Sequence, residues 1–455
     1  MFIKVSEKFR LCRWNNGVYA LSGADRRPFF RLGEKQLQTL LYGEYDGKDA
    51  LVDRLIKSGA VEVCDRRVGS EITEYDNPYF DRVVFSITGR CNYKCMHCSV
   101  NSGAASFEMS PEQIKNTIRG IKECGLDNIT LIGGEPLMRK DFFGVVDELL
   151  DSGLTVASIY TNGSLVNEKV LGELESRGIK PSFQISFDGV GFHDKMRGVN
   201  GAEKNLFRVL ELLRKKDYRV SCYMSLTSES VSSLKETIRS LASFGVSSFT
   251  AYPPFECGRW RNADTAVKPS FERLIEEYIS VTQEYIASAV TMDLEFYRFV
   301  YIRGSDHKYK ILPNAAVKPG SVDVPVCRIY GKELNISPQG YLSPCYAIMD
   351  SNFIKQNMPN INEVSLKTAL SDPAFLRCSS VKAADVLNND PECVRCDYRS
   401  KCGGGCRSSA LTEEGSFWAH DPVMCRMFRE GWYDKLKTAA QTGYSEYLKV
   451  KETAL

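Results

Sequence analysis

Cysteine is the residue type whose number and spacing in this sequence point most directly to chemistry. The 455-residue chain contains 16 cysteines. Three of them, Cys91, Cys95 and Cys98, share one short stretch. Seven others form a spaced frame in the last third of the chain: Cys327, Cys345, Cys393, Cys396, Cys402, Cys406 and Cys425. In a long chain without a secretory signal, clustered thiols indicate metal ligation or redox chemistry rather than disulfides.

The rest of the composition narrows the class of protein. The N-terminus, MFIKVSEKFRLCRW, carries charges where a secretory signal needs an apolar run. No stretch approaches about 18 consecutive apolar residues, so we expect a cytoplasmic protein. The hydrophobic share of 43%, the charged share of 25% and the net charge of +2 indicate a globular chain. This charge predicts neither a nucleic-acid partner nor a membrane partner.

The first group of thiols has the spacing C-x3-C-x2-C and lies in the stretch Gly89-Arg90-Cys91-Asn92-Tyr93-Lys94-Cys95-Met96-His97-Cys98. Three thiolates fill neither a four-coordinate zinc site nor all the irons of a cubane cluster, so one position on the metal stays open. Zinc completed by His97 is an unattractive alternative, because His97 adjoins Cys98 and would strain to reach the same ion.

The elements around this loop predict how it is positioned. From about residue 80 onward, apolar runs typical of buried parallel strands alternate with helical patterns in about six βα units. Strands are expected at 83–88, 128–133, 155–160, 182–187, 219–226 and 246–252, and helices at 111–123, 166–177, 201–215 and 229–243. Six units are too few for an eight-stranded barrel, so we predict an α/β fold with a partial (β/α)6 TIM-type barrel. In such folds the chemistry lies at the C-terminal ends of the strands.

Polar residues follow several of these strands. Gly133-Gly134-Glu135-Pro136 comes after the second strand; its glycines allow close approach of a ligand, and Glu135 offers a carboxylate to an ammonium group. Thr161 and Asn162 follow the third strand with a hydroxyl and an amide suited to ribose. Ser186 ends the fourth strand. We expect these residues to share one site with the thiol loop.

The thiol loop after the first barrel strand resembles the signature of the radical S-adenosylmethionine (radical SAM) superfamily. The resemblance implies a 4Fe-4S cluster held by Cys91, Cys95 and Cys98, with S-adenosyl-L-methionine (SAM) on the fourth iron. One electron would cleave SAM to a 5′-deoxyadenosyl radical, which abstracts hydrogen from an unactivated carbon. The resemblance also implies that the motif from Gly133 to Pro136 binds the methionine amino group.

The resemblance continues after the fourth strand. Phe187-Asp188-Gly189, His193-Asp194 and Arg197-Gly198 are similar to the segment that helps to hold SAM in SPASM-type members of the superfamily. Ser186 and Arg197 are therefore candidate SAM contacts. We expect His193 and Asp194 to be local hydrogen-bonding scaffolding rather than acid-base catalysts.

The C-terminal cysteine frame resembles the SPASM domain, which carries two auxiliary iron-sulfur clusters. Its C-x2-C-x5-C-x3-C core is present without departure. Carried over by position, Cys327, Cys345 and Cys406 ligate the first auxiliary cluster, and Cys393, Cys396, Cys402 and Cys425 ligate the second. The implied cofactors are SAM and three 4Fe-4S clusters, or about 12 iron atoms per chain. Two structural zinc sites are the alternative, with about four iron atoms and two zinc ions.

Three ligands leave the first auxiliary cluster one short. Some SPASM enzymes have an extra cysteine shortly before the equivalent of Cys327, but residues 319–326 contain none. We hypothesise that a substrate thiolate takes this position, as the resemblance to thioether-forming peptide maturases implies. Cys378 or Cys257 would be an internal rival. The remaining cysteines, Cys12, Cys64, Cys124 and Cys222, are expected to be core thiols.

The first 75 residues predict a small winged-helix domain. Strands at 2–5, 10–14 and 18–22, a hairpin turn at Asn15-Asn16-Gly17, two helices and a strand at 61–63 make up this pattern. An exposed hairpin edge accepts a peptide strand, and before a radical SAM barrel such a unit resembles elements that bind a leader peptide. The predicted domains are 1–75 for peptide recognition, 80–310 for the barrel, 311–435 for the iron-sulfur SPASM domain and 436–455 for a C-terminal helix or tail.

The whole arrangement resembles enzymes that mature ribosomally synthesised peptides. The leading hypothesis is a radical SAM enzyme that forms a Cys thioether in a precursor peptide and uses a reductant such as ferredoxin or flavodoxin. Carbon-carbon crosslinking and peptide epimerisation, in which Cys257 would return a hydrogen atom, are alternatives. Anaerobic sulfatase maturation is another, but Tyr346 stands where those enzymes have a basic Asp. The alternative from a different class is a non-catalytic iron-sulfur protein for peptide binding or electron transfer.

Overall fold

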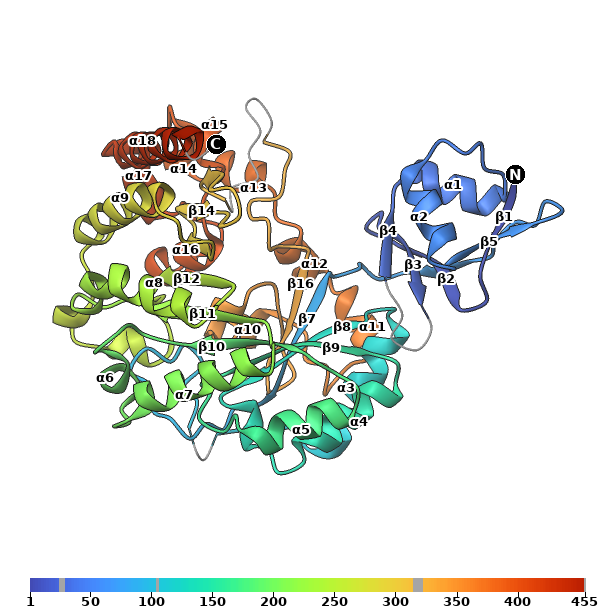
Figure 1. Ribbon diagram of the computed structural model, residues 1–455, viewed down its shortest axis with the longest axis horizontal. Helices are drawn as coiled ribbons and strands as arrows, with labels where there is room; N and C mark the ends of the chain where they lie inside the picture. Colours follow the sequence, from blue (N-terminus) through green and yellow to red (C-terminus); the bar gives the residue numbers. More distant parts are fainter. Residues whose placement is uncertain (24–28, 104–105, 314–321, 454–455) are drawn as a thin grey trace.

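The computed structural model describes residues 1–23, 29–103, 106–313 and 322–453. Residues 319–321 of the cysteine-free stretch and the last two residues of the predicted tail lie outside these ranges. In Figure 1 the N-terminal unit stands to one side of the molecule, and a single connection joins it to the rest. Among the described residues, no helix is long and apolar enough to cross a membrane.

The N-terminal unit contains the predicted hairpin and a hydrophobic core of its own. Its elements are β1 (Phe2–Val5), β2 (Phe9–Trp14), β3 (Tyr19–Gly23), β4 (Phe29–Leu32), α1 (Glu34–Tyr42), α2 (Ala50–Lys57), β5 (Val61–Cys64) and β6 (Ile72–Tyr75). Gly17 has a φ of 74° in the turn between β2 and β3, a conformation that favours glycine. β1 pairs antiparallel with β5, and β6 runs parallel to β2. Leu37, Leu40 and Leu55 anchor both helices in this core.

Six parallel strands confirm the βα repeat that the sequence predicts. The strands are β7 (Arg82–Thr88), β8 (Asn128–Gly133), β9 (Thr155–Thr161), β10 (Ser182–Ser186), β11 (Val220–Ser225) and β12 (Ser248–Tyr252). They pair in chain order. The connecting helices are α3 (Pro111–Glu123), α4 (Phe142–Asp151), α5 (Glu168–Ser176), α6 (His193–Arg197), α7 (Ala202–Lys215) and α8 (Leu234–Ser243). Ser110 and Asn167 cap α3 and α5 by accepting a backbone N–H, which fixes where these helices begin.

The parallel sheet is wider than the sequence predicts. β13 (Asp293–Phe296) adds beside β12, and β16 (Glu333–Ile336) adds beside β7, both in parallel. These four-residue strands alternate polar and apolar residues, so they lack the apolar run that marks the others. β14 (Val300–Ile302), β15 (Tyr309–Ile311) and β17 (Leu342–Ser343) extend the two edges antiparallel. A guanidinium nitrogen of Arg328 lies 3.1 Å from a carboxylate oxygen of Glu295, so an ion pair links the segment before β16 to β13.

The two faces of the barrel strands differ in polarity. Neighbouring residues of a strand point to opposite faces. Val83, Phe85 and Ile87 of β7 belong to the main hydrophobic core with residues of α3, and all three are 0% exposed. The opposite face carries residues such as Tyr160 and Gln184 into the lumen. The apolar runs are therefore buried against helices on one face, and the opposite face lines a lumen with both polar and apolar residues, Val84 and Ile132 among the latter.

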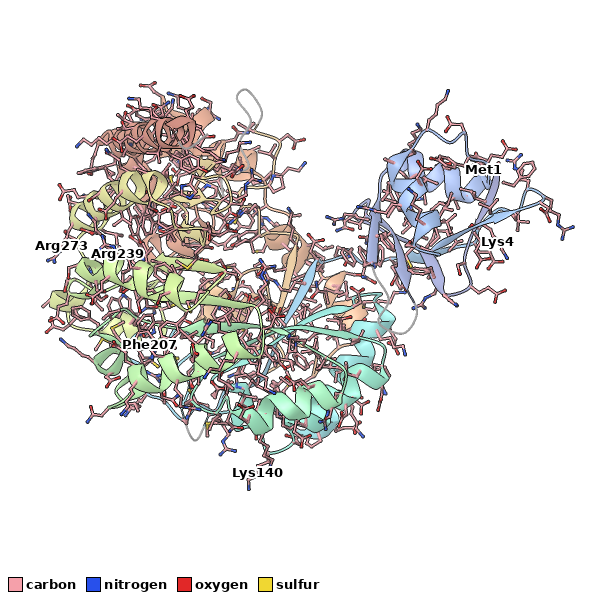
Figure 2. All side chains as sticks on the ribbon, viewed as in Figure 1. Met1, Lys4, Lys140, Phe207, Arg239 and Arg273 are labelled. Carbon is pink, nitrogen blue, oxygen red and sulfur yellow. The ribbon has the colours of Figure 1, made fainter. Side chains whose placement is uncertain are left out.

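The C-terminal segment consists of short helices and one long helix, α18, that pack on the same core as the barrel. They are α10 (Asn352–Asn357), α11 (Leu366–Leu370), α12 (Pro373–Ser379), α13 (Ala383–Leu387), α14 (Pro391–Val394), α15 (Arg399–Cys402), α16 (Arg407–Glu414), α17 (Pro422–Arg429) and α18 (Trp432–Thr453). Phe375 and Phe417 belong to that core. α18 lies beside α9 (Phe271–Ala287), as Figure 1 shows. Elsewhere on the surface of the protein, exposed charged side chains such as Lys140 and Arg273 point outward (Figure 2).

Candidate active site

The thiol loop begins just after β7, and backbone N–H groups face its sulfur atoms. The N–H of Tyr93 donates to Cys91 Sγ, and the N–H of Ser102 donates to Cys98 Sγ, both at 3.4 Å. Burial raises the pKa of Cys91 to about 12, so an unbound thiol here keeps its proton. A bound metal cluster would reverse that preference, and donors aimed at sulfur suit the resulting thiolates.

The middle thiol of the loop, Cys95, contacts a buried ion pair. Arg197 Nη1 lies 3.4 Å from Cys95 Sγ, and Arg197 Nε lies 2.6 Å from Asp188 Oδ2. Burial favours the neutral acid, but the charge of Arg197 outweighs it and holds the pKa of Asp188 well below its usual range. Asp188 lies in the Phe187-Asp188-Gly189 stretch that resembles a SAM-holding segment, but the sequence does not predict its pairing with Arg197.

His97 lies against the same carboxylate. Its Nε2 is 3.8 Å from Asp188 Oδ1, and burial lowers the pKa of His97 to about 4. Within the described residues, no three Cys, His, Asp or Glu side chains converge on a single metal ion. These contacts give no support to a zinc site completed by His97.

The scaffolding roles predicted for His193 and Asp194 are confirmed by their hydrogen bonds. The backbone N–H of Asp188 donates to His193 Nδ1 at 3.1 Å. Asp194 accepts from the N–H of Gly201 at 2.5 Å and from that of Glu203 at 2.7 Å. These bonds fix the strand end and the start of α7.

One cavity of about 300 Å³ joins the thiol loop to the lumen of the barrel. The predicted site residues that line it are Cys91, Cys95, Cys98, Gly133, Gly134, Thr161, Asn162, Ser186 and Arg197. A Cβ atom on Gly134 would lie 2.4 Å from the carbonyl oxygen of Arg90. The glycine therefore lets β8 approach the thiol loop, which is a packing requirement as well as an opening for a ligand.

Glu135 is placed differently from the prediction, because its carboxylate is fully buried and binds the next strand end. It accepts from the hydroxyl of Thr161 at 2.8 Å, from the N–H of Asn162 at 2.8 Å and from the N–H of Leu137 at 3.2 Å. Burial raises the pKa of Glu135 to about 7. Pro136 opens the 3-10 turn that follows. Glu135 thus ties β8 to β9 next to the cavity, and the Thr161 hydroxyl expected to meet ribose is engaged by it.

Arg259 is a site residue that the sequence analysis does not identify. Its Nε donates to the carbonyl of Cys95 and its Nη1 to the carbonyl of Ser102, both at 2.8 Å. A Cβ atom on Gly258 would lie 2.2 Å from the carbonyl oxygen of Cys98. The loop after β12 therefore packs against the thiol loop and donates hydrogen bonds to its backbone. No sequence pattern marks this contact, because Arg259 lies 164 residues from Cys95.

The C-terminal thiols gather in two separate groups. Cys327, Cys345 and Cys406 share one buried environment with Tyr297 and Tyr330. Burial raises the pKa of Cys327 and of Cys345 to about 12. Cys345 also lines the cavity of the thiol loop. A residue of the C-terminal frame therefore reaches the same space as Cys91, Cys95 and Cys98.

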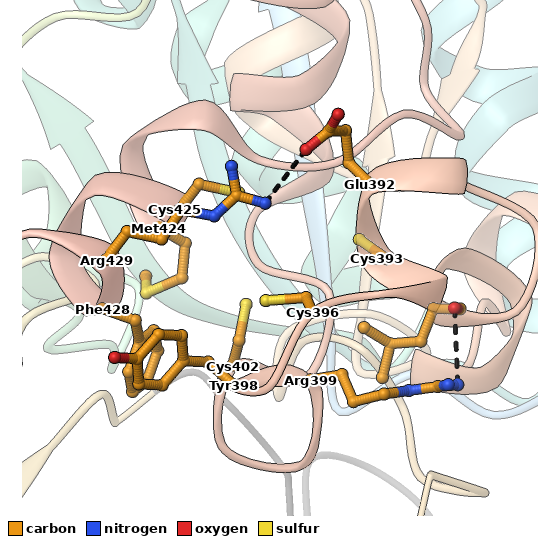
Figure 3. Close-up of a pocket in the computed structure, with 11 residues that line it drawn as sticks. Glu392, Cys393, Cys396, Tyr398, Arg399, Cys402, Met424, Cys425, Phe428 and Arg429 are labelled. Carbon is orange, nitrogen blue, oxygen red and sulfur yellow. Dashed lines mark hydrogen bonds and ion pairs between the residues drawn. The ribbon is translucent and has the colours of Figure 1, made fainter.

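The second C-terminal group lies around a small pocket between α14, α15 and α17. Figure 3 shows Cys393, Cys396, Cys402 and Cys425 around it. Four thiols spread around a shared space suit a cluster, because a single zinc ion requires its four sulfur atoms to converge on one point. The two groups are the same sets that the resemblance assigns to two auxiliary clusters.

The remaining cysteines lie outside both groups. Cys378 is buried on α12, and the thiol of Cys257 donates to the carbonyl of Ala347 at 3.4 Å. The expectation of a core thiol is wrong for Cys64, which is partly exposed because β5 pairs with β1 alone in the described sheet. The core thiols are Cys12, Cys124 and Cys222.

Comparison with known proteins identifies the class. Residues 85–241 match the family model of the Radical SAM superfamily. The chain therefore contains a radical SAM domain. An AdoMet-dependent heme synthase of Methanosarcina barkeri is 23% identical over 356 residues, which are 75% of this chain and 95% of the relative.

Two further similarities concern peptide substrates. A PqqA peptide cyclase of Bradyrhizobium diazoefficiens is 23% identical over 348 residues, which are 75% of this chain and 85% of the relative. The structure of Streptococcus suis SuiB bound to the precursor peptide SuiA matches with a TM-score of 0.62 at 15% identity, over 93% of this chain and 100% of that chain. The shared fold therefore extends over nearly the whole chain, and the predicted α/β partial barrel is confirmed.

Proposed function

We propose that this protein modifies a ribosomally made precursor peptide by radical SAM chemistry and forms a thioether between a cysteine sulfur and a carbon of another residue. The observation that carries the proposal is the position of Cys345. Its thiol belongs to the first C-terminal group, and it lines the cavity of the Cys91 loop. A peptide residue in this cavity would lie between the two sets of ligands.

The thiols of the chain fit three 4Fe-4S clusters. Donors face the sulfur atoms of the thiol loop, the first C-terminal group gathers beside Tyr297 and Tyr330, and the second lines a small pocket. The cluster at Cys91, Cys95 and Cys98, when bound, supplies the electron that cleaves SAM, and the resulting radical abstracts hydrogen. The ligands in this proposal are Cys91, Cys95 and Cys98; then Cys327, Cys345 and Cys406; then Cys393, Cys396, Cys402 and Cys425.

The chain's own residues would orient SAM and the peptide. Asn162 Nδ2 donates to Asn92 Oδ1 at 2.9 Å, which holds the amide at the mouth of the thiol loop beside Ser186 and Arg197. Farther into the lumen, Tyr160 and Gln184 offer hydrogen-bonding groups to a polar substrate. Buried polar groups select substrates that satisfy them, so Tyr160 and Gln184 favour a substrate that carries polar groups, such as a peptide.

A substrate sulfur has a place in this proposal because the first C-terminal group holds three thiols. Cys378 lies on α12, and Cys257 bonds to Ala347. Within the described residues, neither observation places a fourth thiol in contact with Cys327, Cys345 or Cys406. The substrate cysteine would then bind as a thiolate, which fixes its sulfur while carbon chemistry proceeds nearby.

The N-terminal unit supports binding of the leader part of the peptide. Among the described strands β5 pairs with β1 only, and Val63 on β5 is 59% exposed. A strand edge with free backbone groups binds a peptide by adding it as a further strand. The likeness to SuiB, whose structure holds a precursor peptide, also supports this role.

The alternatives have weaker support at the site. Tyr346 lines the cavity where sulfatase-maturating enzymes have a basic Asp. Burial raises the pKa of its phenol above the ordinary value of about 10, so it is a poor base at neutral pH. Epimerisation through Cys257 would need that thiol to face the cavity, whereas the described lining includes its hydrogen-bond partner Ala347 and not Cys257 itself. Carbon-carbon crosslinking would not use an open position on the auxiliary cluster. A non-catalytic role would not explain a SAM cavity that reaches the cluster thiols.

A second candidate substrate class is a tetrapyrrole, because the sequence relatives include an AdoMet-dependent heme synthase. Mass spectrometry distinguishes the two. The protein is coexpressed with a cysteine-containing precursor peptide taken from the reading frame beside its gene. A thioether predicts loss of two hydrogen atoms and of one alkylatable thiol. An unchanged peptide, together with conversion of an iron porphyrin by the purified enzyme, would contradict the proposal.

A further inference from the structure

Arg298 occupies a backbone conformation that normally favours glycine. It is the middle residue of the three-residue turn that joins β13 to β14, and its φ is 76°. Turns of this length usually place Gly or Asn in the left-handed conformation, because a side chain there is strained. Strain of this kind persists where the side chain is needed, so the contacts of Arg298 are informative.

The side chain of Arg298 is buried and charged. Only 8% of it is exposed, and its Nη1 lies 3.3 Å from Asp421 Oδ2. The guanidinium carbon lies 5.7 Å from the ring centre of Phe255 and 5.8 Å from that of Phe299. It also lies against the thiol of Cys406. A buried cation thus sits between a carboxylate and a thiol of the first C-terminal group.

Asp421 connects this cation to both C-terminal groups. Its Oδ2 accepts the backbone N–H of Cys406 at 2.7 Å. Its Oδ1 accepts the N–H groups of Val423 and Met424 and so caps α17, the helix that carries Cys425. Asp421 is 1% exposed. The contact is close, since a Cβ atom on Gly405 would lie 2.4 Å from the Cβ of Asp421.

We propose that Arg298, oriented by Asp421, is a positioning residue that holds the Cys406 thiolate and raises the reduction potential of the first auxiliary cluster. The inference rests on the auxiliary clusters of the proposed function. Charge and hydrogen bonds next to the ligand sulfurs set the potential of an iron-sulfur cluster. A positive charge beside Cys406 stabilises the reduced, more negative cluster. The second auxiliary cluster has no such contact with Arg298 in the described residues.

The test uses the full chain with Cys91, Cys95 and Cys98 replaced by Ala, so that only auxiliary clusters contribute to the spectra. Arg298→Gly removes the charge and suits the left-handed backbone, whereas Arg298→Lys keeps the charge. The control is Asp217→Gly, which changes another non-glycine residue of positive φ, 54°, on the exposed surface. Iron content is measured, and the clusters are titrated potentiometrically by EPR.

If the Arg298→Gly variant retains its iron, one of the two midpoint potentials is expected to become more negative by about 59 mV. This shift corresponds to a tenfold change in the equilibrium constant of a one-electron reduction. Arg298→Lys and Asp217→Gly should leave both potentials near those of the parent. Loss of one cluster in Arg298→Gly but not in Arg298→Lys also supports the role of the charge. Unchanged potentials in Arg298→Gly, or equal cluster loss in Gly and Lys variants, would overturn the inference. A parent chain without auxiliary iron would overturn the proposed cofactors as well.

Discussion

Arg197 binds Cys95 and Asp188 at the same time: its Nη1 lies 3.4 Å from Cys95 Sγ, and its Nε lies 2.6 Å from Asp188 Oδ2. Cys95 belongs to the loop after β7, whereas Asp188 follows β10, and β8 and β9 lie between these two strands in the sheet. One guanidinium therefore couples the proposed cluster ligand to the end of β10. Its positive charge is balanced by a carboxylate that is 0% exposed.

Replacement of Arg197 by Met should leave Asp188 as an unpaired buried charge. Breaking such a pair costs about 3 to 5 kcal/mol, so the melting temperature and the yield of 5′-deoxyadenosine should both fall. The double variant Arg197→Met with Asp188→Asn removes both charges and should recover part of the stability but not the activity. Arg273→Met, at an exposed position, is the matched control. Wild-type melting and SAM cleavage in the single variant would contradict the role of this pair.

Glu135 should make the stability of the cluster-free protein depend on pH. Burial raises its pKa from an ordinary value near about 4.3 to about 7. The folded state therefore binds a proton more tightly than the unfolded state. The stabilisation is complete below pH 4.3 and is lost as pH rises towards 7, by at most about 4 kcal/mol.

Glu135→Gln, which mimics the protonated acid, should remove this dependence. The measurement is urea unfolding of the cluster-free wild type and of the variant between pH 5 and 8. As pH rises, the free energy of unfolding of the variant should increase relative to that of the wild type. A constant difference across the range would show that Glu135 titrates normally.

Metal analysis should find about 12 iron atoms per reconstituted chain and no stoichiometric zinc. Replacing Cys393 and Cys396 by Ala should lower the iron content by about four atoms, because these thiols share one pocket. Replacing Cys12 and Cys222, which are core thiols, is the control and should leave the iron content unchanged. About four iron atoms together with two zinc ions would favour the structural zinc alternative.

A lysine at Val63 should weaken binding of the precursor peptide by about tenfold without changing SAM cleavage in the absence of peptide. Charged residues on an edge strand oppose the addition of another strand. Leu448→Lys on α18 is the control, because Leu448 is also an exposed apolar residue, at 42%. Fluorescence anisotropy of a labelled precursor measures the affinity. Equal affinities for wild type and Val63→Lys would exclude β5 as the docking edge.

The sequence predicts the parts of this fold that depend on local pattern. The six parallel strands stand where apolar runs mark them, and the thiols of the C-terminal frame separate into the groups that the resemblance to the SPASM domain implies. β13 and β16 are not predicted from the sequence pattern, because each is only four residues long and carries polar side chains on its lumen face. Their position depends on pairing with β12 and β7, which is a property of the assembled sheet.

The site shows the same division between local and long-range information. The cysteine loop and the residues at the strand ends follow from motifs, but Arg259 meets Cys95 across 164 residues without a motif. Glu135 is the opposite case: its motif predicts a ligand contact, whereas the fold surrounds its carboxylate with donors from Thr161, Asn162 and Leu137. Which donors surround a carboxylate depends on neighbouring strands, and the order of residues along one chain segment does not encode it.

The most direct test of the central claim is anaerobic incubation of the reconstituted enzyme with dithionite, SAM and the precursor peptide. The account predicts one 5′-deoxyadenosine for each peptide that has lost two hydrogen atoms and one iodoacetamide-reactive thiol, and no product with Cys91, Cys95 and Cys98 replaced by Ala. Formation of 5′-deoxyadenosine with every peptide thiol still reactive would contradict thioether formation. Absence of 5′-deoxyadenosine from enzyme with a full complement of iron would contradict radical SAM chemistry.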